Sequence, residues 1–362
     1  MIADLAYLIA IHSLNKLGAA KLARLFDFYG YHGEMAWKQP QGWQEAAGLA
    51  RLQVEELLAA RRDCSVEKIY ESYLASGAGV ITLRDTRYPM LLRQIYAPPP
   101  LLFYKGELPT DDDICLAMIG SRRASGYGYQ VAETLARDLA AQGLTIVSGM
   151  ARGIDGICHQ HTMLAGGRTV AVLGGGVDII YPREHKRLYH GIMRQGAVLS
   201  EFPLGSPPAT FNFPLRNRII SGLSRGVLVI EAGDKSGTLL TVDHGLEQGR
   251  DIFAVPGPIT SAVSFGTNRL IAQGAKLVQT AEDVWREYLD VPKPVLTAEE
   301  KEKRPQLAPE ERDLLMQMSL PLHFDQLLAL SGWPTNKLAA LLTMWEIRGL
   351  IRQLPGKNYQ RK

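Results

Sequence analysis

Short apolar segments alternate with longer amphipathic segments through the middle of the chain, and this alternation constrains the fold more than any other feature. The apolar segments lack the polar–apolar alternation of a half-exposed strand, so each is predicted to be a strand buried on both faces of a sheet. Strands that alternate with helices in this way form a doubly wound, mostly parallel sheet of the Rossmann-like α/β class. The predicted strands span residues 114–119, 145–148, 169–173, 197–200, 227–231 and 252–255.

Two further strands, at residues 79–83 and 101–104, precede this alternation. The sheet domain is therefore predicted to cover residues 79–290. Its helices are expected near residues 127–142, 155–165, 183–194, 215–224 and 237–248.

Residues 1–78 have helical periodicity, with Leu5, Leu8 and Ile9 on one face. They predict a small helical domain of the SAM-like or helix-hairpin-helix-like kind, with a turn at residues 15–18. Bundles with such a Leu-Gly turn sometimes contact the DNA backbone. A packing or interaction domain is the favoured interpretation, because short motifs produce many false matches.

The C-terminal part has the element order of a winged-helix domain. Residues 291–306 combine three prolines with a run of charges, which predicts a linker. Residues 307–362 form the predicted domain. Its three helices and one hairpin are expected at 309–318, 324–331, 335–348, 350–354 and 359–361. The last helix offers only Lys337 and Arg348 as basic residues, so protein interaction or regulation fits at least as well as DNA reading.

The composition excludes several classes of protein. Hydrophobic residues make up 46% of the chain, too many for a disordered or collagen-like protein. Cys64, Cys115 and Cys158 form no CxxC pair, which excludes a zinc ribbon and indicates reduced thiols in the cytoplasm. We expect no membrane association, since no apolar run reaches the ~18 residues of a membrane span. The net charge of +3 favours no partner by itself.

Gly-rich turns follow the predicted strands, and several of them carry a cation. The carboxyl ends of parallel strands meet at one edge of a sheet, where ligands bind. Glycines let backbone N–H groups approach a phosphate, helix N-termini attract anions, and arginine pairs with phosphate oxygens. Any one such turn could be a plain tight connection, but several at one edge predict a groove for a polyanion. The candidate DNA-binding residues are Gly120, Ser121, Arg122, Arg152, Gly153, Tyr181, Arg183, Arg216, Asn217, Arg218, Lys235, Ser236 and Gly237.

Aromatic residues lie close to these cations in the sequence. A basic groove with stacking rings holds single strands without reading their sequence. Tyr181 is the best stacking candidate, whereas Phe211 and Phe213 fit the core and a stacking role equally well.

Enzyme motifs are missing. The chain has no Walker A motif, no complete G-x-G-x-x-G at its first strand–helix turn and no G-x-S-x-G, so we expect neither catalysis nor a cofactor. Asp155, Cys158, His159 and His161 share one predicted helix, but a structural role is favoured over a metal site. Glu201 and Glu231 end strands at the same edge, where salt-bridge or capping roles are favoured over acid–base chemistry.

Several motifs in residues 88–280 resemble those of the DNA-processing protein A (DprA/Smf) family. The two most specific are Ser148-Gly149-Met150-Ala151-Arg152-Gly153-Ile154-Asp155 and Arg216-Asn217-Arg218-Ile219-Ile220. Others are Ile119-Gly120-Ser121-Arg122, Ser200-Glu201-Phe202-Pro203 and Ser236-Gly237-Thr238.

This resemblance implies a non-enzymatic protein that binds single-stranded DNA through its Rossmann-like domain and forms a homodimer. It also implies that the protein protects incoming DNA and hands it to the recombinase RecA during natural transformation. Arg122 would clamp a phosphate, Arg152 and Lys235 would assist, and Tyr181 would stack on a base.

Two alternatives remain open. One is a nucleotide hydrolase similar to the lysine-decarboxylase-like phosphoribohydrolases, although their Pro-Gly-Gly-x-Gly-Thr-x-x-Glu motif is absent from this chain. The other is a scaffold that binds DNA only incidentally.

Overall fold

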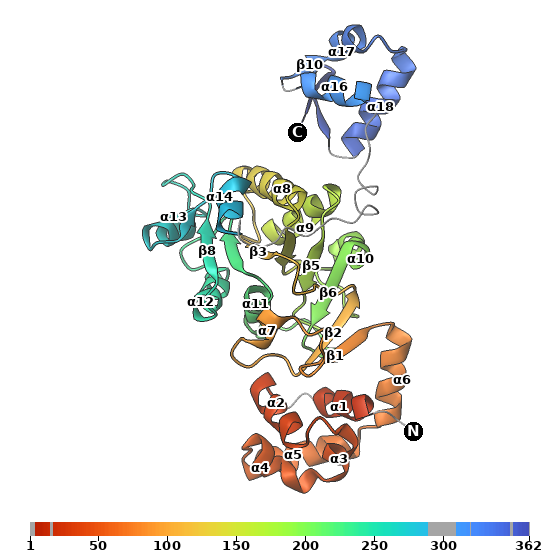
Figure 1. The fold of residues 1–362 in the computed structure, drawn as a ribbon, viewed down its shortest axis with the longest axis vertical. Coiled ribbons are helices and arrows are strands. Elements are labelled where there is room, and N and C mark those ends of the chain that lie inside the picture. The colour runs from red at the N-terminus through yellow and green to blue at the C-terminus, as the bar shows by residue number, and fades with distance from the viewer. Residues whose placement is uncertain (1–3, 15–16, 289–308, 319, 348–349, 362) are drawn as a thin grey trace. The chain divides into compact units, whose positions relative to one another are not determined.

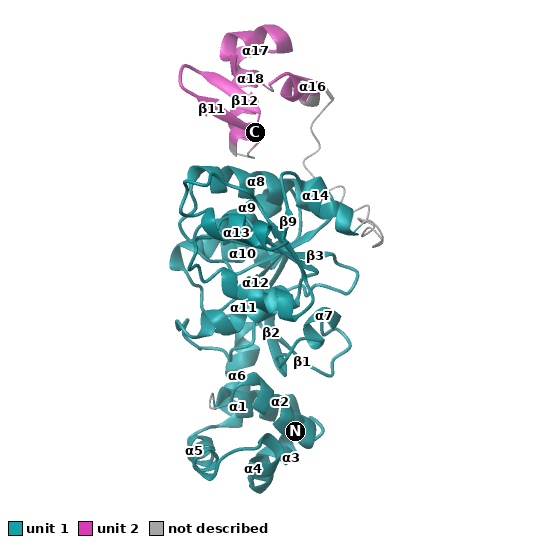
Figure 2. Cartoon of the chain, turned by 90° about the vertical axis from the view of Figure 1, so that its left-hand side faces the viewer, with its two compact units in different colours: residues 1–294 teal, residues 295–362 magenta. Residues whose placement is uncertain are grey.

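The computed structural model describes residues 4–14, 17–288, 309–318, 320–347 and 350–361. The chain divides into two compact units, residues 1–294 and residues 295–362 (Figure 2). Each unit has a hydrophobic core of its own. Among the described residues, no helix combines the length and the apolar character needed to cross a membrane.

The first unit contains one mixed sheet, in which the described strands have the order β1-β2-β6-β5-β4-β3-β7-β8-β9 (Figure 1). From β6 to β9 all neighbouring strands are parallel, whereas β2 is antiparallel to both β1 and β6. The prediction of a doubly wound, mostly parallel sheet is confirmed. The strands are β1 Gly79–Thr82, β2 Leu101–Gly106, β3 Cys115–Ile119, β4 Thr145–Ser148, β5 Thr169–Val172, β6 Gly196–Ser200, β7 Gly226–Val229, β8 Asp251–Ala254 and β9 Lys276–Leu277.

The order of the strands reverses between β3 and β7. From β3 the chain moves outward through β4, β5 and β6, and then it crosses to β7 and moves outward through β8 and β9. The connections that follow β3 and β7 therefore leave in opposite directions. This switch point is where open α/β sheets leave a crevice for a ligand.

Helices cover both faces of the sheet. One face packs against α8, α9 and α14, the other against α7, α11, α12 and α13, and α10 covers β5 and β6. Every residue of β3 to β7 is buried as a result, which explains why these strands show no polar–apolar alternation. The helices are α7 Met90–Arg93, α8 Gly126–Ala141, α9 Ile154–Leu164, α10 Lys186–Gln195, α11 Asn212–Gly222, α12 Leu239–Glu247, α13 Phe265–Ala272 and α14 Ala281–Trp285, with 3-10 turns at Arg183–His185 and Arg286–Tyr288.

The helix α11 begins at Asn212, before the predicted start at residue 215. Pro214 lies in its first turn, where backbone N–H groups have no partner within the helix, so a proline is tolerated there. The Asn212 side chain also donates from Nδ2 to the Gly174 carbonyl (2.9 Å), which ties the helix start to the turn after β5. Helix α11 therefore begins earlier than the approximate range predicted from the sequence, and residues 213–218 are helical.

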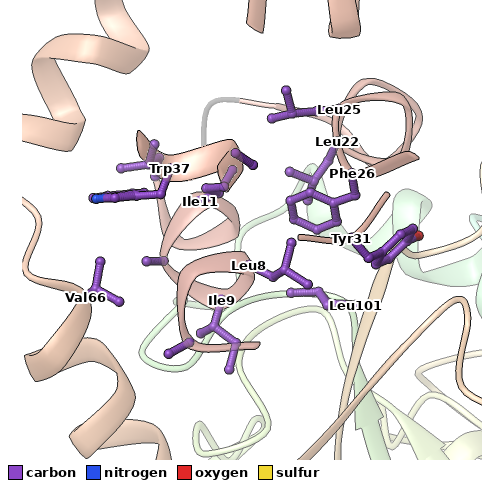
Figure 3. Packing of buried hydrophobic residues seen from close by; sticks show 14 of the residues in the cluster. Leu8, Ile9, Ile11, Leu22, Leu25, Phe26, Tyr31, Trp37, Val66 and Leu101 are labelled. Atoms are coloured by element: carbon purple, nitrogen blue, oxygen red, sulfur yellow. The ribbon is translucent and has the colours of Figure 1, made fainter. Parts of the chain in front are cut away.

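The predicted N-terminal helices are confirmed in the described residues, and they pack on the antiparallel edge of the sheet. Their core includes Leu8, Phe26 and Trp37 and continues onto β2 through Leu101 (Figure 3). Residues 15 and 16 of the predicted turn lie outside the described residues. The helices are α1 Asp4–Ser13, α2 Ala19–Phe28, α3 Gly33–Lys38, α4 Trp43–Ala47, α5 Arg51–Arg62 and α6 Val66–Ser76, with a 3-10 turn at Pro40–Gly42.

The second unit has the predicted winged-helix order, with a short additional strand. Leu327, Leu338 and Trp345 lie in its core. Arg348 and the predicted linker at 291–306 lie outside the described residues. The elements are α16 Pro309–Gln317, β10 Leu322–His323, α17 Phe324–Ser331, α18 Thr335–Ile347, β11 Ile351–Leu354 and β12 Asn358–Arg361.

Candidate nucleic-acid interface

A groove of about 560 Å³ lies at the switch point of the sheet. The turns after β3, β4 and β7 line it together with the first turns of α11. A smaller pocket beside Gly174 and Gly175 shares Arg122, Tyr181 and Phe213 with it, so the two form one depression. We call this depression the first groove.

The first groove brings together most of the residues predicted from the sequence. Gly153, Arg183, Arg218 and Lys235 are not among its lining residues. The predicted residues that line it are Gly120, Ser121, Arg122, Arg152, Tyr181, Arg216, Asn217, Ser236 and Gly237.

An arginine and two aromatic rings lie together in this lining. The Arg122 guanidinium carbon lies 5.1 Å from the centroid of the Phe213 ring, a cation–π distance. The Tyr181 ring lies 5.8 Å from the Phe213 ring, with 31° between their planes. Arg122 and Tyr181 are exposed and Phe213 is half-buried, so this cluster offers a cation and ring surface to a ligand.

The turn after β4 is held by buried side chains beneath it. Asp155 accepts hydrogen bonds on Oδ2 from the backbone N–H groups of Gly149 (3.2 Å) and Ala151 (3.4 Å). The Met150 N–H group donates to His159 Nε2 (3.3 Å). Burial lowers the pKa of His159 to about 3, so this imidazole is neutral and can accept the hydrogen bond. The structural roles favoured for Asp155 and His159 are confirmed.

Gly153 lies where the turn after β4 packs against the turn after β3. Its φ of +73° is in the region that favours glycine. A Cβ at this position would also collide with the carbonyl oxygen of Ser121 in the turn after β3. Gly153 therefore lets the turns after β3 and β4 approach each other.

Arg216 forms the floor of the groove. Its Nη1 donates to the carbonyl oxygens of Gly149 (2.7 Å) and Val172 (2.6 Å), which joins the turn after β4 to the end of β5. Burial lowers the pKa of Arg216 to about 10, and the charge of nearby Asp155 opposes that shift. The guanidinium is therefore charged at neutral pH, but one of its nitrogens is already engaged by the protein.

Arg218 faces away from the first groove. Each residue of a helix turns by about 100°, so Arg216 and Arg218, two positions apart, point to nearly opposite sides of α11. Arg218 donates from Nη2 to Glu201 Oε2, and both side chains are largely buried. The structure thus separates two arginines that the sequence motif places together.

The two carboxylates predicted to form salt bridges or caps do so. Glu201 pairs with Arg218, as described above. Glu231 accepts from the Ser125 N–H group (3.0 Å) and from the Ser125 hydroxyl at the start of α8. Among the described residues, no group of three His, Cys, Asp or Glu side chains is placed to hold a metal ion.

The cations at and beside the groove differ in whether they form ion pairs. Arg152 pairs with Glu184 at the surface, and Lys235 and Arg183 are exposed beside the groove. Arg122 forms no ion pair with any described residue. Sequence reasoning omitted Thr238, whose hydroxyl donates to the Gly120 carbonyl (3.1 Å) and closes the groove between the turns after β3 and β7. Its place next to Ser236 and Gly237 in one turn was the available signal.

The fold and the site define a class of protein. It is a Rossmann-like α/β protein whose switch point carries Gly-rich turns and a free arginine, an arrangement suited to anionic ligands.

Comparisons with known proteins narrow this class to one family. Residues 79–289 match the family described as DNA recombination-mediator protein A, and residues 298–357 match the DprA winged helix domain. The Smf protein of Synechocystis is 32% identical over 99% of this chain and 98% of its own length. The Smf protein of Escherichia coli is 48% identical over 54% of this chain and 53% of its own length. The chain belongs to the DNA-processing protein A (DprA/Smf) family.

Solved structures of the family are similar to this chain. DNA processing protein A from Streptococcus pneumoniae has a TM-score of 0.68 and 35% identity, and the match covers 77% of this chain and 97% of that one. DNA processing protein A from Helicobacter pylori has a TM-score of 0.53 and 29% identity over 59% of this chain and 98% of that one. The second structure is described as showing the single-stranded DNA binding mode of that protein.

Proposed function

We propose that this protein binds single-stranded DNA in the first groove, protects it, and passes it to the recombinase RecA during DNA uptake, natural transformation and recombination. The observation that carries the proposal is Arg122, which lies over the Phe213 ring in a groove made of Gly-rich turns. A phosphate can meet the guanidinium and the N–H groups of the turns while a base stacks on the rings. Family membership and the Helicobacter pylori relative support this assignment.

The ring surface of Tyr181 and Phe213 favours a single strand over a duplex. The faces of bases in a duplex are covered by their neighbours, so Tyr181 and Phe213 would gain little stacking from it. A single strand offers free base faces to both rings. We therefore expect the affinity for a single strand to exceed that for a duplex of equal length.

The partner and the oligomeric state belong to the same proposal. We expect a cytoplasmic homodimer without enzymatic activity whose protein partner is RecA, as the family resemblance implies. Exposed apolar side chains on α12 and α13, Leu246 and Phe265 among them, offer surface for such contacts.

Replacing Arg122 by alanine tests the groove. The substitution Arg122→Ala removes a charged donor to phosphate and should weaken single-strand binding by about tenfold to a hundredfold. Arg123→Ala is the matched control, because Arg123 is also exposed but does not line the groove. Fluorescence anisotropy with labelled single strands and duplexes measures both. Equal affinities of the two variants for single strands would show that the groove is assigned wrongly.

RecA assembly tests the second half of the proposal. The rate of RecA filament formation on a single strand should rise when the parent protein is present and should not rise with Arg122→Ala. A parent protein that binds the strand but leaves this rate unchanged would refute the role in RecA loading.

A further inference from the structure

A second groove of about 720 Å³ lies in the same compact unit. It runs between the start of α2, the segment that follows α7, and the segment 201–209 that leads to α11. Arg218 and Glu201 belong to its lining, and the role proposed above makes no use of it.

The first turns of α11 form the wall between the two grooves. Because a helix turns by about 100° per residue, positions three and four apart share one side of it, and the two sets of positions below follow this spacing. Phe213, Arg216, Asn217 and Ile220 line the first groove. The positions that line the second groove are Phe211, Asn212, Leu215 and Arg218. A chain-like ligand that leaves the first groove therefore reaches the second by crossing one helix.

Exposed rings lie along the second groove. Tyr96 is 91% exposed and Phe211 is 72% exposed, and both line it. Phe211 is thus not a core residue, which settles one of the alternatives left open by the sequence. Exposed aromatic rings in a groove are what successive bases of a single strand stack upon.

The charges of this groove suit a polyanion. Lys21 lines it, and its Nζ donates to the neutral side-chain amide of Gln53 (3.1 Å), so its charge is not neutralised by that contact. Among the described lining residues the one carboxylate is Glu201, and it already pairs with Arg218. The lining thus keeps an excess of positive charge beside its rings.

We propose that a single strand bound in the first groove crosses the start of α11 and continues in the second groove, where Phe211 and Tyr96 stack on its bases and Lys21 faces its backbone. This inference rests on the proposed function. The binding site would then extend from the switch point of the sheet to the N-terminal helices. The ligand of the second groove would be nucleotides rather than a peptide.

The dependence of affinity on strand length tests this path. Oligothymidylates from about 4 to about 20 nucleotides bracket the site sizes of single-strand binding folds. In the full chain, the double variant Tyr96→Ala/Phe211→Ala should bind the shortest strands as the parent does. It should bind the longest strands about tenfold more weakly or worse, since each lost base–ring contact has an effect of that size.

Phe28→Ala is the matched control, because Phe28 is 54% exposed in the same unit and lines neither groove. It should follow the parent at every length. Since all three rings are exposed, the variants should keep the thermal unfolding midpoint of the parent.

Two results would overturn the path. A double variant that equals the parent at every length would show that the second groove holds no nucleotide, and would leave a peptide as its occupant. A loss that is equal at every length would place Phe211 or Tyr96 at the first groove. A different result would refute the proposed function itself: Arg122→Ala would then bind even the shortest strand as tightly as the parent does.

Discussion

Arg216 and Arg218 have different roles because they point to different sides of the same helix. Arg216 points under the Gly-rich turns and holds two backbone carbonyls, whereas Arg218 points to the opposite side and pairs with Glu201. Neither leaves a fully free guanidinium, in contrast to Arg122. We infer that Arg216 mainly positions the turns that would meet the phosphate, and that Arg122 makes the direct contact.

Replacing Arg216 by alanine should therefore affect stability as well as binding. The change leaves the carbonyls of Gly149 and Val172 without their donor and Asp155 without its nearby charge. We expect the free energy of unfolding to fall by about 3 kcal/mol or more. Unfolding in urea measures it, and the exposed Arg183→Ala serves as the control, with a change within about 0.5 kcal/mol. Equal stabilities of the two variants would contradict the positioning role.

The turn after β4 depends on neutral groups beneath it. Met150 has a φ of +54°, and its N–H group is held by the uncharged imidazole of His159. Protonation of His159 would replace the acceptor by a donor and place a charge in the core. The shape of this part of the first groove is therefore linked to pH.

Acid should destabilise the fold through this histidine. The pKa of His159 is lowered by burial to about 3, against about 6.5 in the unfolded chain, so the unfolded state binds the proton more readily below pH 6.5. The stability that the neutral imidazole contributes is present above about pH 6.5 and is lost as the pH falls. This group alone should lower the free energy of unfolding by about 1.4 kcal/mol per pH unit.

Urea unfolding at several pH values between about 7 and 5 measures this slope. His12, whose pKa burial lowers to about 4, adds to it, whereas the raised pKa values of Asp155 and Glu201 act in the opposite direction. His159→Gln should remove its own share of the slope, and the exposed His190→Gln should not. If the free energy of unfolding of His159→Gln depends on pH as steeply as that of the parent, the proposed link between His159 and acid stability is refuted.

The sequence predicts well those elements whose burial requires a recognisable run of apolar side chains. Strands β3 to β8 were predictable to within a few residues, because helices cover both faces and require apolar side chains throughout. The two-residue strands β9 and β10 are too short to leave such a pattern. The approximate range predicted for α11 begins too late, because Pro214 resembles a loop residue although it is acceptable in a first helical turn.

The same helix shows how far the sequence can group residues at the site. Arg216 and Arg218 both stand among the candidate DNA-binding residues predicted from the sequence. Helical geometry separates them, and the pairing of Glu201 with Arg218 across distant segments leaves no local signal in the sequence. The Gly-rich turns were predictable, because the carboxyl ends of parallel strands must meet at one edge.

In the whole molecule, the first groove, the second groove and the N-terminal helices belong to residues 1–294, while residues 295–362 form a unit with its own core. Strand binding is therefore a property of the first unit in our interpretation. The second unit is free to serve another purpose, such as contact with a protein.

Removal of residues 295–362 should leave single-strand binding within about twofold of the full chain, a difference below 0.5 kcal/mol. Anisotropy with the long oligothymidylate compares the two proteins, and circular dichroism confirms that the shortened chain folds. A drop of tenfold or more would assign part of the binding site to the winged-helix unit.

The most direct test of phosphate binding at the switch point is the salt dependence of single-strand affinity. For the parent, the logarithm of the association constant should fall linearly with the logarithm of salt concentration, because each neutralised phosphate releases counterions. Arg122→Ala should make that slope shallower by about the amount that one phosphate contact contributes. Arg123→Ala should keep the slope of the parent. A slope that is the same in the parent and in Arg122→Ala would contradict the claim that Arg122 clamps a phosphate in the first groove.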